Sequence, residues 1–413
     1  MLRSGRAPAR PWREALFGGV WPPRCVATTE LLNRYLYKFN FPLTNTMKII
    51  DLNLSGFRNY ENFHCDFDPG VNLIVGQNAQ GKTNLLEAIC YLSRGAAFRT
   101  RKEAELIRFG AEFAELSARV DSYGREQTLR AVMFSGRRPR QLWLSGVKKS
   151  SREDLDGVLN TVLFCPEDLL VLKKGAAERR KLLDDALCQL RPKYARALEE
   201  YRRLLAQKSA VLRDRFERPD LLELLPEYNE RMAQTGAIVV TTRAKYLRML
   251  EERAALHHGA FSGGRESLRL EYRTVSTVTD PAASPRQVYE QLRDHQQSHY
   301  RAELESIQCL SGPHKDDFEA TLNHRSVKTF GSQGQTRTCA ISLKLAERDL
   351  FEADTGELPV LLLDDVLSEL DPGRQDFVVN QIKRGQVFIT CCEQDKVTDI
   401  GKTIHIENGA LLV

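Results

Sequence analysis

The chain has 413 residues, enough for two or three domains and for a hydrophobic core that needs no disulfide or metal to hold it. Hydrophobic residues at 42% and charged residues at 28%, with no apolar run near the roughly 18 residues of a membrane helix, exclude an integral membrane protein, a collagen-like fibre and a mainly disordered chain. The net charge of +5 falls entirely within residues 1–46, so a nucleic-acid surface elsewhere must be a local patch.

Residues 1–46 differ in composition from the rest of the chain, with seven basic side chains and only two acidic ones. A targeting peptide is one interpretation, but the segment lacks a continuous apolar stretch followed by a small-residue cleavage site. The first strand-like pattern begins at Met47. We therefore expect residues 1–46 to be a disordered extension or to lie upstream of the natural start.

The region from Met47 to about Gly157 is rich in predicted strands. Short apolar or alternating runs with β-favouring residues predict strands at Ile49–Leu54, Val71–Val75, Phe113–Val120, Thr128–Phe134 and Gln141–Leu144. One helix, from about Lys82 to Leu92, interrupts them.

The middle of the chain is charged and periodic at helical spacing, which predicts helices over residues 176–216, 226–257 and 285–308. Beyond it we expect strands at 318–322, 360–363 and 387–390, and a helix from about 335 to 352. Strand-rich sequence on both sides of a helical region predicts an α/β domain, residues 47–160 and 310–413, interrupted by an inserted helical lobe, residues 161–309.

A phosphate-binding motif follows the second predicted strand. It has the pattern G-x-x-x-x-G-K-[ST] and comprises Gly76, Gln77, Asn78, Ala79, Gln80, Gly81, Lys82 and Thr83. The glycines let backbone N–H groups face phosphate oxygens, Lys82 reaches the β- and γ-phosphates, and the Thr83 hydroxyl ligates Mg²⁺. A strand before the motif and a helix after it are the required context, because phosphate binds at the helix N-terminus. A plain glycine turn between strand and helix is the alternative.

An apolar strand that ends in two carboxylates is the expected partner of such a loop. The run Val360–Leu363 leads directly into Asp364 and Asp365. We expect Asp364 to hold the Mg²⁺ shell and Asp365 to orient or deprotonate the attacking water, so that Lys82 and Asp365 are the candidate catalytic residues. Alone, the run also fits a buried strand entering a solvated loop. Together with the loop motif, it indicates nucleoside triphosphate hydrolysis.

A third motif narrows the class of ATPase. Ser332 and Gly334 belong to an S-x-G-Q pattern at the start of the helix before the carboxylate strand, and an S-E-L-D segment, Ser368–Asp371, follows that strand. This order resembles the ABC ATPases, in which a Ser and a Gly at a helix N-terminus close over the γ-phosphate bound by the opposite subunit. A hydroxyl, bare N–H groups and a helix dipole suit an anion there. An ordinary helix cap at Ser332 explains the pattern about as well.

A more specific resemblance is to the RecF family of bacterial recombination and DNA-repair ATPases, and it covers nearly the whole chain beyond the first 46 residues. The segments that carry it are Met47–Ile49, Gly56–Tyr60, Gly76–Ile89, Pro166–Leu169, Lys174–Gly175 with Arg179, Arg180 and Asp184, Gly312–Asp317, Gly331–Glu347 and Leu361–Asp371. The resemblance implies an α/β fold, an ABC-type P-loop ATPase head with an inserted helical lobe. It also implies ATP at the Gly76–Thr83 loop, Mg²⁺ at Thr83 and Asp364, and trans contacts from Ser332 and Gly334.

Two positions have alternative interpretations, and three others depart from the ABC pattern. Arg58 and Tyr60 lie where related enzymes pack against the nucleoside, or they form an exposed loop pair. Three departures from the ABC pattern are Asp365 in place of the usual Glu, Cys391 where many ABC ATPases have a His, and Pro166–Asp168 where a Gln is usual. Each weakens transition-state positioning, so we expect slow, switch-like hydrolysis.

Two clusters of basic residues are candidate DNA contacts. Residues 173–215 contain thirteen Lys and Arg side chains against six acids, so this helical region either tracks a phosphate backbone without sequence preference or is solvated with internal ion pairs. Arg137–Arg140 form a second cluster at an expected hairpin tip, with Lys148–Lys149 nearby. Neither a helix-turn-helix nor a zinc-finger pattern stands out in the sequence, so specific base readout is not expected.

The nine cysteines are odd in number and include no C-x-x-C pair, which argues against a zinc site or a disulfide framework and suits a reducing cytosol. The features together predict a cytoplasmic, ATP-dependent DNA-binding protein of recombinational repair and replication restart. ATP is expected to join two subunits on single-stranded, gapped or duplex DNA, and weak, DNA-stimulated hydrolysis to release them. The resemblance implies RecR and RecO type mediator proteins as partners and a part in SOS induction.

Two other classes of ATPase are alternatives to a DNA-repair protein. A transporter nucleotide-binding subunit would need a surface for a membrane partner, and the basic helical insertion argues for DNA instead. An SMC-type chromosome protein would need coiled-coil arms with sustained heptads, and the predicted helices are far too short for them.

Overall fold

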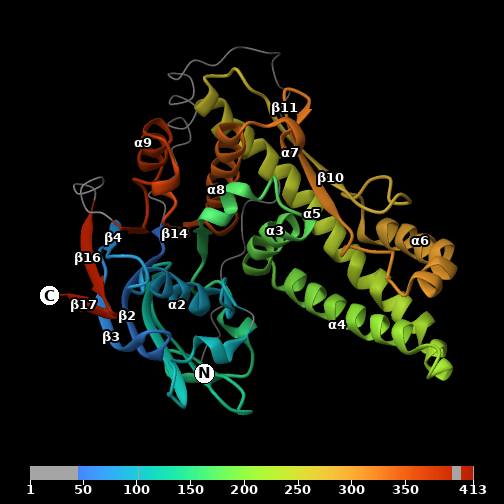
Figure 1. Cartoon of the computed structure of the whole chain (residues 1–413), viewed down its shortest axis with the longest axis horizontal. Helices are drawn as coiled ribbons and strands as arrows, with labels where there is room; N and C mark the ends of the chain where they lie inside the picture. The colour runs from blue at the N-terminus through green and yellow to red at the C-terminus, as the bar shows by residue number, and fades with distance from the viewer. Residues whose placement is uncertain (1–44, 101, 393–400, 413) are drawn as a thin grey trace, which may run out of the picture. The chain divides into compact units, whose positions relative to one another are not determined.

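The structure is a computed structural model that describes residues 45–100, 102–392 and 401–412 (Figure 1). Most of the expected extension therefore lies outside the described residues. Its last two residues form strand β1 (Asn45–Thr46), which pairs in parallel with β13 (Glu357–Leu358).

A mainly parallel sheet of six strands carries the phosphate-binding motif. Its order is β17-β16-β4-β15-β14-β9, and within it only β17 runs antiparallel to its neighbour. The strands are β4 (Val71–Val75), β9 (Thr161–Phe164), β14 (Val360–Asp364), β15 (Val387–Cys391), β16 (Lys402–Glu407) and β17 (Ala410–Leu412). Every residue of β9 and β14 is buried, as in parallel strands that are covered on both faces.

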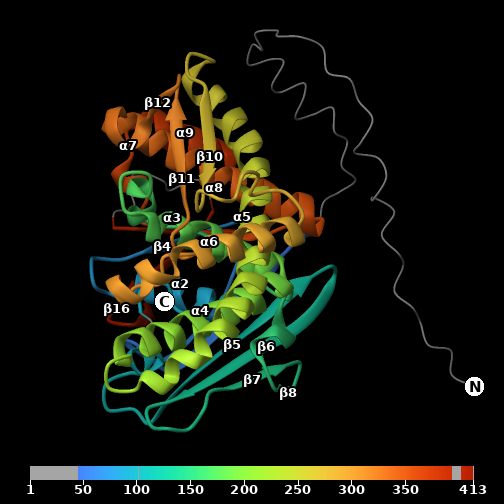
Figure 2. The ribbon, with the colours of Figure 1, turned by 90° about the vertical axis from the view of Figure 1, so that its right-hand side faces the viewer.

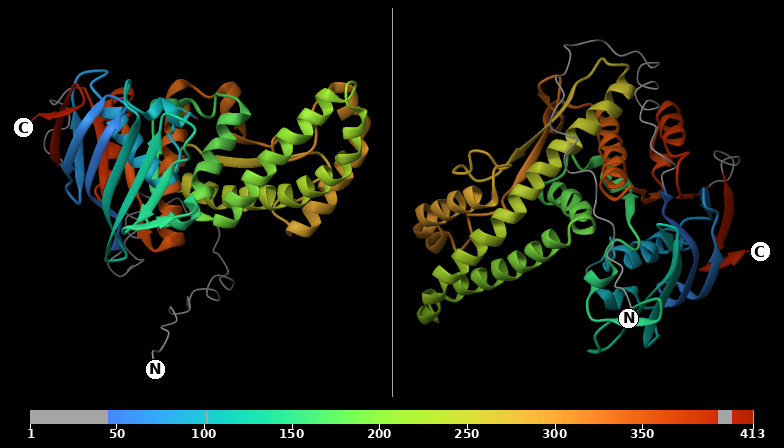
Figure 3. Two further views of the ribbon diagram at one scale, coloured as in Figure 1. Left: turned by 90° about the horizontal axis from the view of Figure 1, so that it is seen from below. Right: turned by 180° about the vertical axis from the view of Figure 1, so that it is seen from behind.

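A second six-stranded sheet is antiparallel, with the order β3-β2-β5-β6-β7-β8 (Figure 3). Its strands are β2 (Lys48–Phe57), β3 (Tyr60–Asp66), β5 (Phe113–Ser122), β6 (Arg125–Phe134), β7 (Gln141–Leu144) and β8 (Val147–Lys149). The helix after the phosphate-binding motif, α2 (Lys82–Arg94), packs against β5 and β6 and also against β14 and β15. It therefore contacts both large sheets.

The inserted lobe is built on α5 (Leu225–Ser262), a helix of 38 residues that packs against α4, α6 and α8 (Figures 1 and 2). Its other elements are α3 (Ala176–Leu190), α4 (Pro192–Asp214), α6 (Pro285–Ser306) and β10 (Leu268–Arg273). Strand β10 forms a small sheet with β11 (Asp317–Leu322) and β12 (Arg325–Ser326), which lie beyond the expected end of the lobe at residue 309. Within the described ranges, no helix combines the length and apolar character needed to cross a membrane.

Three further α-helices follow the lobe in the described part of the chain. They are α7 (Val327–Phe330), α8 (Gln333–Thr355) and α9 (Pro372–Gln381). Short 3-10 helices lie at η1 (Glu103–Leu106), η2 (Arg152–Leu155), η3 (Pro166–Leu170), η4 (Pro219–Leu224) and η5 (Leu367–Glu369).

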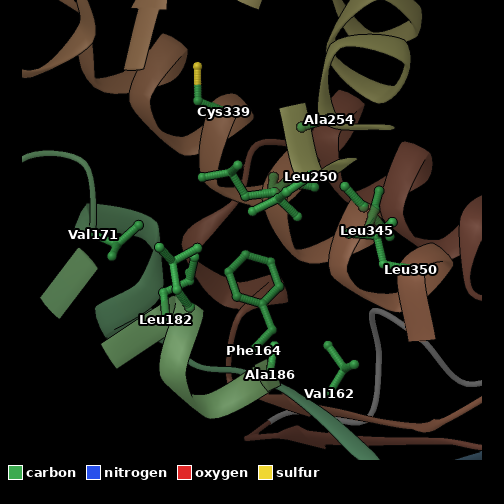
Figure 4. Close-up of a cluster of buried hydrophobic side chains, with 14 of the residues drawn as sticks. Val162, Phe164, Val171, Leu182, Ala186, Leu250, Ala254, Cys339, Leu345 and Leu350 are labelled. Carbon is green, nitrogen blue, oxygen red and sulfur yellow. The ribbon is translucent and has the colours of Figure 1, made fainter. Parts of the chain in front are cut away.

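One hydrophobic cluster joins the parallel sheet to the lobe and to α8 (Figure 4). It includes Phe164 of β9, Leu182 and Ala186 of α3, Leu250 of α5 and Leu345 of α8. Because close-packed cores resist deformation, the root of the lobe is anchored to the sheet beside β9.

The structure changes two of the boundaries expected from sequence. The lobe was expected from residue 161, but β9 pairs with β14, so the parallel sheet extends to Phe164. A four-residue apolar run has no periodicity by which a sheet strand could be told from the start of a helical region. The helix expected over 176–216 is two helices, because Arg191 leaves helical geometry and Pro192 has no N–H with which to continue the first one.

Candidate nucleotide-binding site

The phosphate-binding motif forms a tight loop between β4 and α2, the context that the sequence predicted. Ala79 and Gly81 adopt positive φ angles of 65° and 117°. A Cβ at Gly81 would come within 2.8 Å of the Asn59 amide nitrogen, and one at Gly76 within 2.3 Å of the Ile406 carbonyl oxygen. Both positions therefore need glycine for space, and Gly81 also needs it for its backbone conformation.

Asn59 and Tyr60 support the loop from the turn between β2 and β3. The Asn59 amide donates to the carbonyl oxygen of Gln80 at 2.9 Å, and the Tyr60 hydroxyl donates to that of Gly81 at 2.9 Å. Tyr60 is fully buried, and Arg58 forms an ion pair with a glutamate of α2. The interpretation of Arg58 and Tyr60 as an exposed pair is wrong, because this turn packs directly under the loop.

Lys82 is only 6% exposed and is enclosed by the loop itself. Its Nζ donates to the carbonyl oxygens of Gly76 at 2.6 Å and Gln77 at 2.8 Å, and it lies 3.6 Å from the Cys392 sulfur. These acceptors replace the water that a buried ammonium group loses. Because α2 begins at Lys82, an anion in the loop would face both this cation and the N–H groups of the first helical turn.

Thr83 and Asp364 connect the loop to the carboxylate strand. The Thr83 hydroxyl donates to Asp364 Oδ1 at 2.8 Å, and the Thr390 hydroxyl donates to the same oxygen at 2.9 Å. Burial raises the pKa of Asp364, while both hydroxyl hydrogen bonds and the positive charge of Arg99 lower it. A hydroxyl and a carboxylate held together in this way are the hard oxygen ligands that suit Mg²⁺.

Asp365 lies directly beyond β14 and takes a left-handed backbone conformation, with φ at 51°. Its N–H donates to the Thr390 hydroxyl oxygen at 2.8 Å, and its carbonyl accepts from the Ser368 hydroxyl at 2.8 Å. A non-glycine residue in this conformation costs free energy, which these contacts offset. Asp365 is half-buried and so remains accessible beside Asp364.

The cysteine beside the loop is Cys392. Cys391 ends β15 and packs against the hydrophobic cluster of the sheet, where burial raises the pKa of its thiol. The Cys392 thiol donates to the Asn78 side chain at 2.9 Å and lies near Lys82. Cys391 was expected at the position where many ABC ATPases have a His, because the sequence does not show which of two adjacent cysteines faces the loop.

Three residues beside the site were not predicted from the sequence, namely Thr390, Asn59 and Arg99. Thr390 is the last residue but one of β15, the strand that lies between β4 and β14. The carboxyl ends of parallel strands meet at one edge of a sheet, and ligands bind there. A polar residue at the end of a predicted apolar strand was therefore a usable signal for Thr390. The turn and loop positions of Asn59 and Arg99 offered no comparable signal.

Ser332 is the N-cap of α8. Its hydroxyl oxygen accepts from the Gln335 N–H at 3.2 Å, and the Gln335 side chain accepts from the Ser332 N–H at 2.9 Å, a reciprocal capping box. Gly334 accepts from Arg374 Nη2 at 3.0 Å, and a Cβ at Gly334 would lie 2.9 Å from that nitrogen. Among the described residues, Ser332 and Gly334 form no hydrogen bond with the phosphate-binding loop.

The basic region 173–215 is largely engaged in contacts within the chain. At least five of its thirteen cations form ion pairs, namely Arg179, Arg191, Arg202, Arg203 and Lys208. Three more, Lys173, Arg180 and Arg215, donate to backbone carbonyl oxygens. The interpretation of this region as helices with internal ion pairs is favoured over a continuous phosphate-binding surface.

Comparison with known proteins shows which family the chain belongs to. Residues 48–410 match the family described as RecF/RecN/SMC N terminal domain. The chain is 36% identical over 343 residues to the DNA replication and repair protein RecF of Acetivibrio thermocellus, covering 83% of this chain and 92% of that protein. The chain belongs to the RecF family. The RecF protein of Lacticaseibacillus paracasei is 39% identical over 349 residues, covering 83% of this chain and 92% of that protein.

Solved RecF structures have the same fold as this family member. A structure of the recombination mediator protein RecF-ATPrS in the RecFOR pathway matches with a TM-score of 0.83 and 31% identity, covering 89% of this chain and 98% of that one. A RecF-ATP structure matches with a TM-score of 0.81 and 32% identity, covering 90% and 99%. An Smc head domain from Pyrococcus furiosus, at a TM-score of 0.52 and 19% identity over 89% and 95%, shares the fold alone. The predicted family and the predicted ABC-type head with an inserted helical lobe are confirmed.

Proposed function

We propose that this chain is an ATP-binding DNA replication and repair protein whose ATP-dependent homodimer holds DNA. The observation that carries the proposal is the Thr83–Asp364 hydrogen bond, which joins the phosphate-binding loop to a carboxylate strand 281 residues away. The relatives named DNA replication and repair protein RecF, and the RecF-ATP structure, support it.

ATP fits the loop by charge. The loop N–H groups and Lys82 would hold the β- and γ-phosphates, and the hydroxyl of Thr83 with the carboxylate of Asp364 would hold Mg²⁺. When bound, Mg²⁺ neutralises part of the phosphate charge. Asp365 would orient the attacking water and accept its proton. Since its side chain is one methylene shorter than the Glu of most ABC ATPases, we expect weak, DNA-stimulated hydrolysis that acts as a switch.

The dimer would place the N-terminus of α8 over the γ-phosphate of the other subunit. In the capping box the Ser332 hydroxyl uses a lone pair, so its hydrogen remains available for a phosphate oxygen. Gly334 keeps the first turn of α8 free of a side chain beside that position. The helix dipole adds to the attraction.

The DNA would be single-stranded, gapped or duplex, bound without sequence preference. The protein would act in recombinational repair and replication restart with RecR and RecO type mediator proteins, in the cytoplasm, and would be needed for SOS induction. Family membership supports these roles and partners. The lack of a recognition motif in the sequence supports DNA binding without sequence preference.

Sedimentation velocity with no nucleotide, ADP and ATP, each with and without gapped DNA, tests the proposal. We expect a dimer with ATP and slower dissociation of that dimer on DNA. Ser332→Arg should bind ATP but stay monomeric, because a long cation replaces a small donor at the interface. Ser306→Arg, at the exposed end of α6, is the control and should dimerise normally. A wild-type protein that stays monomeric with ATP would contradict the two-subunit mechanism.

A further inference from the structure

The antiparallel sheet has one buried face and one open face. On β6 and β7, Leu129, Ala131 and Leu142 belong to the hydrophobic core that includes residues of α2. The register places Arg130 opposite Trp143, and Trp143 opposite Lys148. Side chains directly opposite each other in an antiparallel sheet share a face. Arg130, Trp143 and Lys148 therefore form a row on the open face, at the free edge of the sheet where β8 is the last strand (Figure 2).

Aromatic rings and cations alternate on this open face. The Arg130 guanidinium lies 4.5 Å from the centre of the Trp143 ring, and the Lys148 ammonium lies 6.0 Å from it. Phe134 lies four residues after Arg130 on β6, and the guanidinium of Arg138, from the loop after β6, lies 4.2 Å from the centre of its ring. Phe113 of β5 is opposite Phe134 and is 45% exposed. Three aromatic side chains and three cations thus share one surface.

The cations of this surface are available for a partner. Arg138 and Lys148 are exposed, as is Arg137, the neighbour of Arg138 in the loop after β6, and none of the three forms an ion pair with a described residue. Arg130 is different, because it pairs with both oxygens of Glu115, at 2.6 Å and 2.9 Å. The pair fixes the guanidinium plane beside Trp143, so that the stacked unit is preorganised. The surface keeps a positive excess that its own fold does not neutralise.

We propose that this face, defined by Trp143, Phe134, Phe113, Arg137, Arg138 and Lys148, binds single-stranded nucleic acid. The proposal rests on the proposed DNA-binding function and locates the contact for a strand. Unpaired bases have exposed ring faces that stack on aromatic and guanidinium planes, while the cations meet the phosphates. A duplex keeps its bases stacked internally and could use only the cations. An acidic protein segment could also use only the cations.

Tryptophan fluorescence tests the site directly. The chain has three tryptophans, and Trp12 and Trp21 are the other two. In full-length Trp12→Phe/Trp21→Phe protein, Trp143 is therefore the sole reporter. Titration with a dT oligonucleotide should quench it in a saturable way, whereas a duplex of the same length or polyglutamate should quench it little. Equal quenching by the duplex or by polyglutamate would overturn the assignment to a single strand.

Substitutions test the same face independently of that reporter. Trp143→Ala should weaken dT binding about tenfold, the order expected for one lost base stack, and Trp143→Phe should restore most of it. Arg137→Gln/Arg138→Gln should lower the slope of log affinity against log salt by about 1.4, from about 0.7 for each lost phosphate contact. Phe216→Ala is the matched control, because Phe216 is an exposed ring with Arg215 at 4.1 Å but lies at the end of α4.

The outcomes separate this inference from the proposed function. A wild-type protein that binds neither dT nor gapped DNA would contradict the proposed function itself. A wild-type protein that binds dT, with Trp143→Ala binding it equally well, would leave the function standing and overturn the site. A thermal melt of each variant shows whether a loss of binding comes from unfolding. If Trp143→Ala is unfolded, dT binding by Trp143→Phe tests the site, because a phenylalanine ring can still stack on a base.

Discussion

In the proposed dimer, ATP would lie between the phosphate-binding loop of one subunit, called the loop side, and the N-terminus of α8 of the other subunit, called the signature side. These two sides are held in place in different ways. On the loop side, close backbone packing sets the geometry, because Gly76 and Gly81 leave no room for a side chain and the turn at Asn59 holds the loop from beneath. On the signature side, defined as the start of α8 with Ser332 and Gly334, the tethers are long side chains whose acceptors are backbone carbonyl oxygens or, for Gln335, a carboxylate.

Two of the three signature-side tethers come from the lobe. Lys173, just before α3, donates to the carbonyl oxygen of Gly331 at 2.9 Å, and Gln335 donates to Glu266, just before β10, at 2.7 Å. The third is Arg374 of α9. Long side chains adjust at lower cost than packed backbone does. The loop side is therefore preformed, whereas the position of the signature side depends largely on the lobe.

The largest expected effect is on the loop side, at Asp365. Asp365→Asn keeps the size of the side chain but removes the carboxylate that would orient water, so hydrolysis should fall by at least about 100-fold. ATP binding should persist through Lys82, Thr83 and Asp364, and the ATP dimer should accumulate on DNA. Phosphate release and sedimentation measure the two effects. Asp376→Asn, an exposed carboxylate on α9, is the control, and hydrolysis at the parent rate in the Asp365 variant would exclude its role.

Lys82 should give the next largest effect. Lys82→Ala removes the one cation enclosed by the loop, and a hydrogen-bonded charge of this kind is worth roughly 1.5–3 kcal/mol. ATP affinity in a filter-binding assay should fall by about tenfold to a hundredfold. Lys383→Ala, an exposed lysine just after α9, should leave affinity unchanged. Unchanged ATP binding in Lys82→Ala would mean that the loop is not the phosphate site.

The loop side was largely predictable from sequence, whereas on the signature side the S-x-G-Q motif was recognisable but the contacts that hold it were not. The motif from Gly76 to Thr83 and the strand ending at Asp364 are local patterns whose spacing reflects their geometry. The tethers from Lys173 and Glu266 join residues far apart in the chain, and neither belongs to a motif with a structural meaning of its own. The two interpretations of the cations in residues 173–215 stayed open for the same reason, because the sequence gives the number of cations but does not show which of them form ion pairs.

A pair of glycine substitutions sharpens the difference between preformed and adjustable sides. Gly81→Ala meets a φ of 117° and the fixed Asn59 and Tyr60 side chains, so it should cost about 1–3 kcal/mol of stability and reduce ATP binding. Gly334→Ala meets only the end of the flexible Arg374 side chain at 2.9 Å, in a helix that tolerates alanine. It should leave the free energy of unfolding nearly unchanged. Denaturant unfolding of both variants is the measurement, and equal losses would contradict the comparison.

The smallest effect separates the two interpretations of Ser332. Ser332→Ala removes an N-cap and should cost about 1 kcal/mol of stability. Ser284 offers a matched control, because it caps α6 with the same reciprocal contacts to Gln287, at 3.3 Å and 3.2 Å. Ser284→Ala should lose a similar free energy of unfolding. If the Ser332 hydroxyl also contacts the γ-phosphate of a second subunit, Ser332→Ala should in addition weaken the ATP dimer about tenfold, the order for one hydrogen bond to a charged group. Sedimentation of both variants with ATP decides it, because a cap alone predicts that they dimerise equally well.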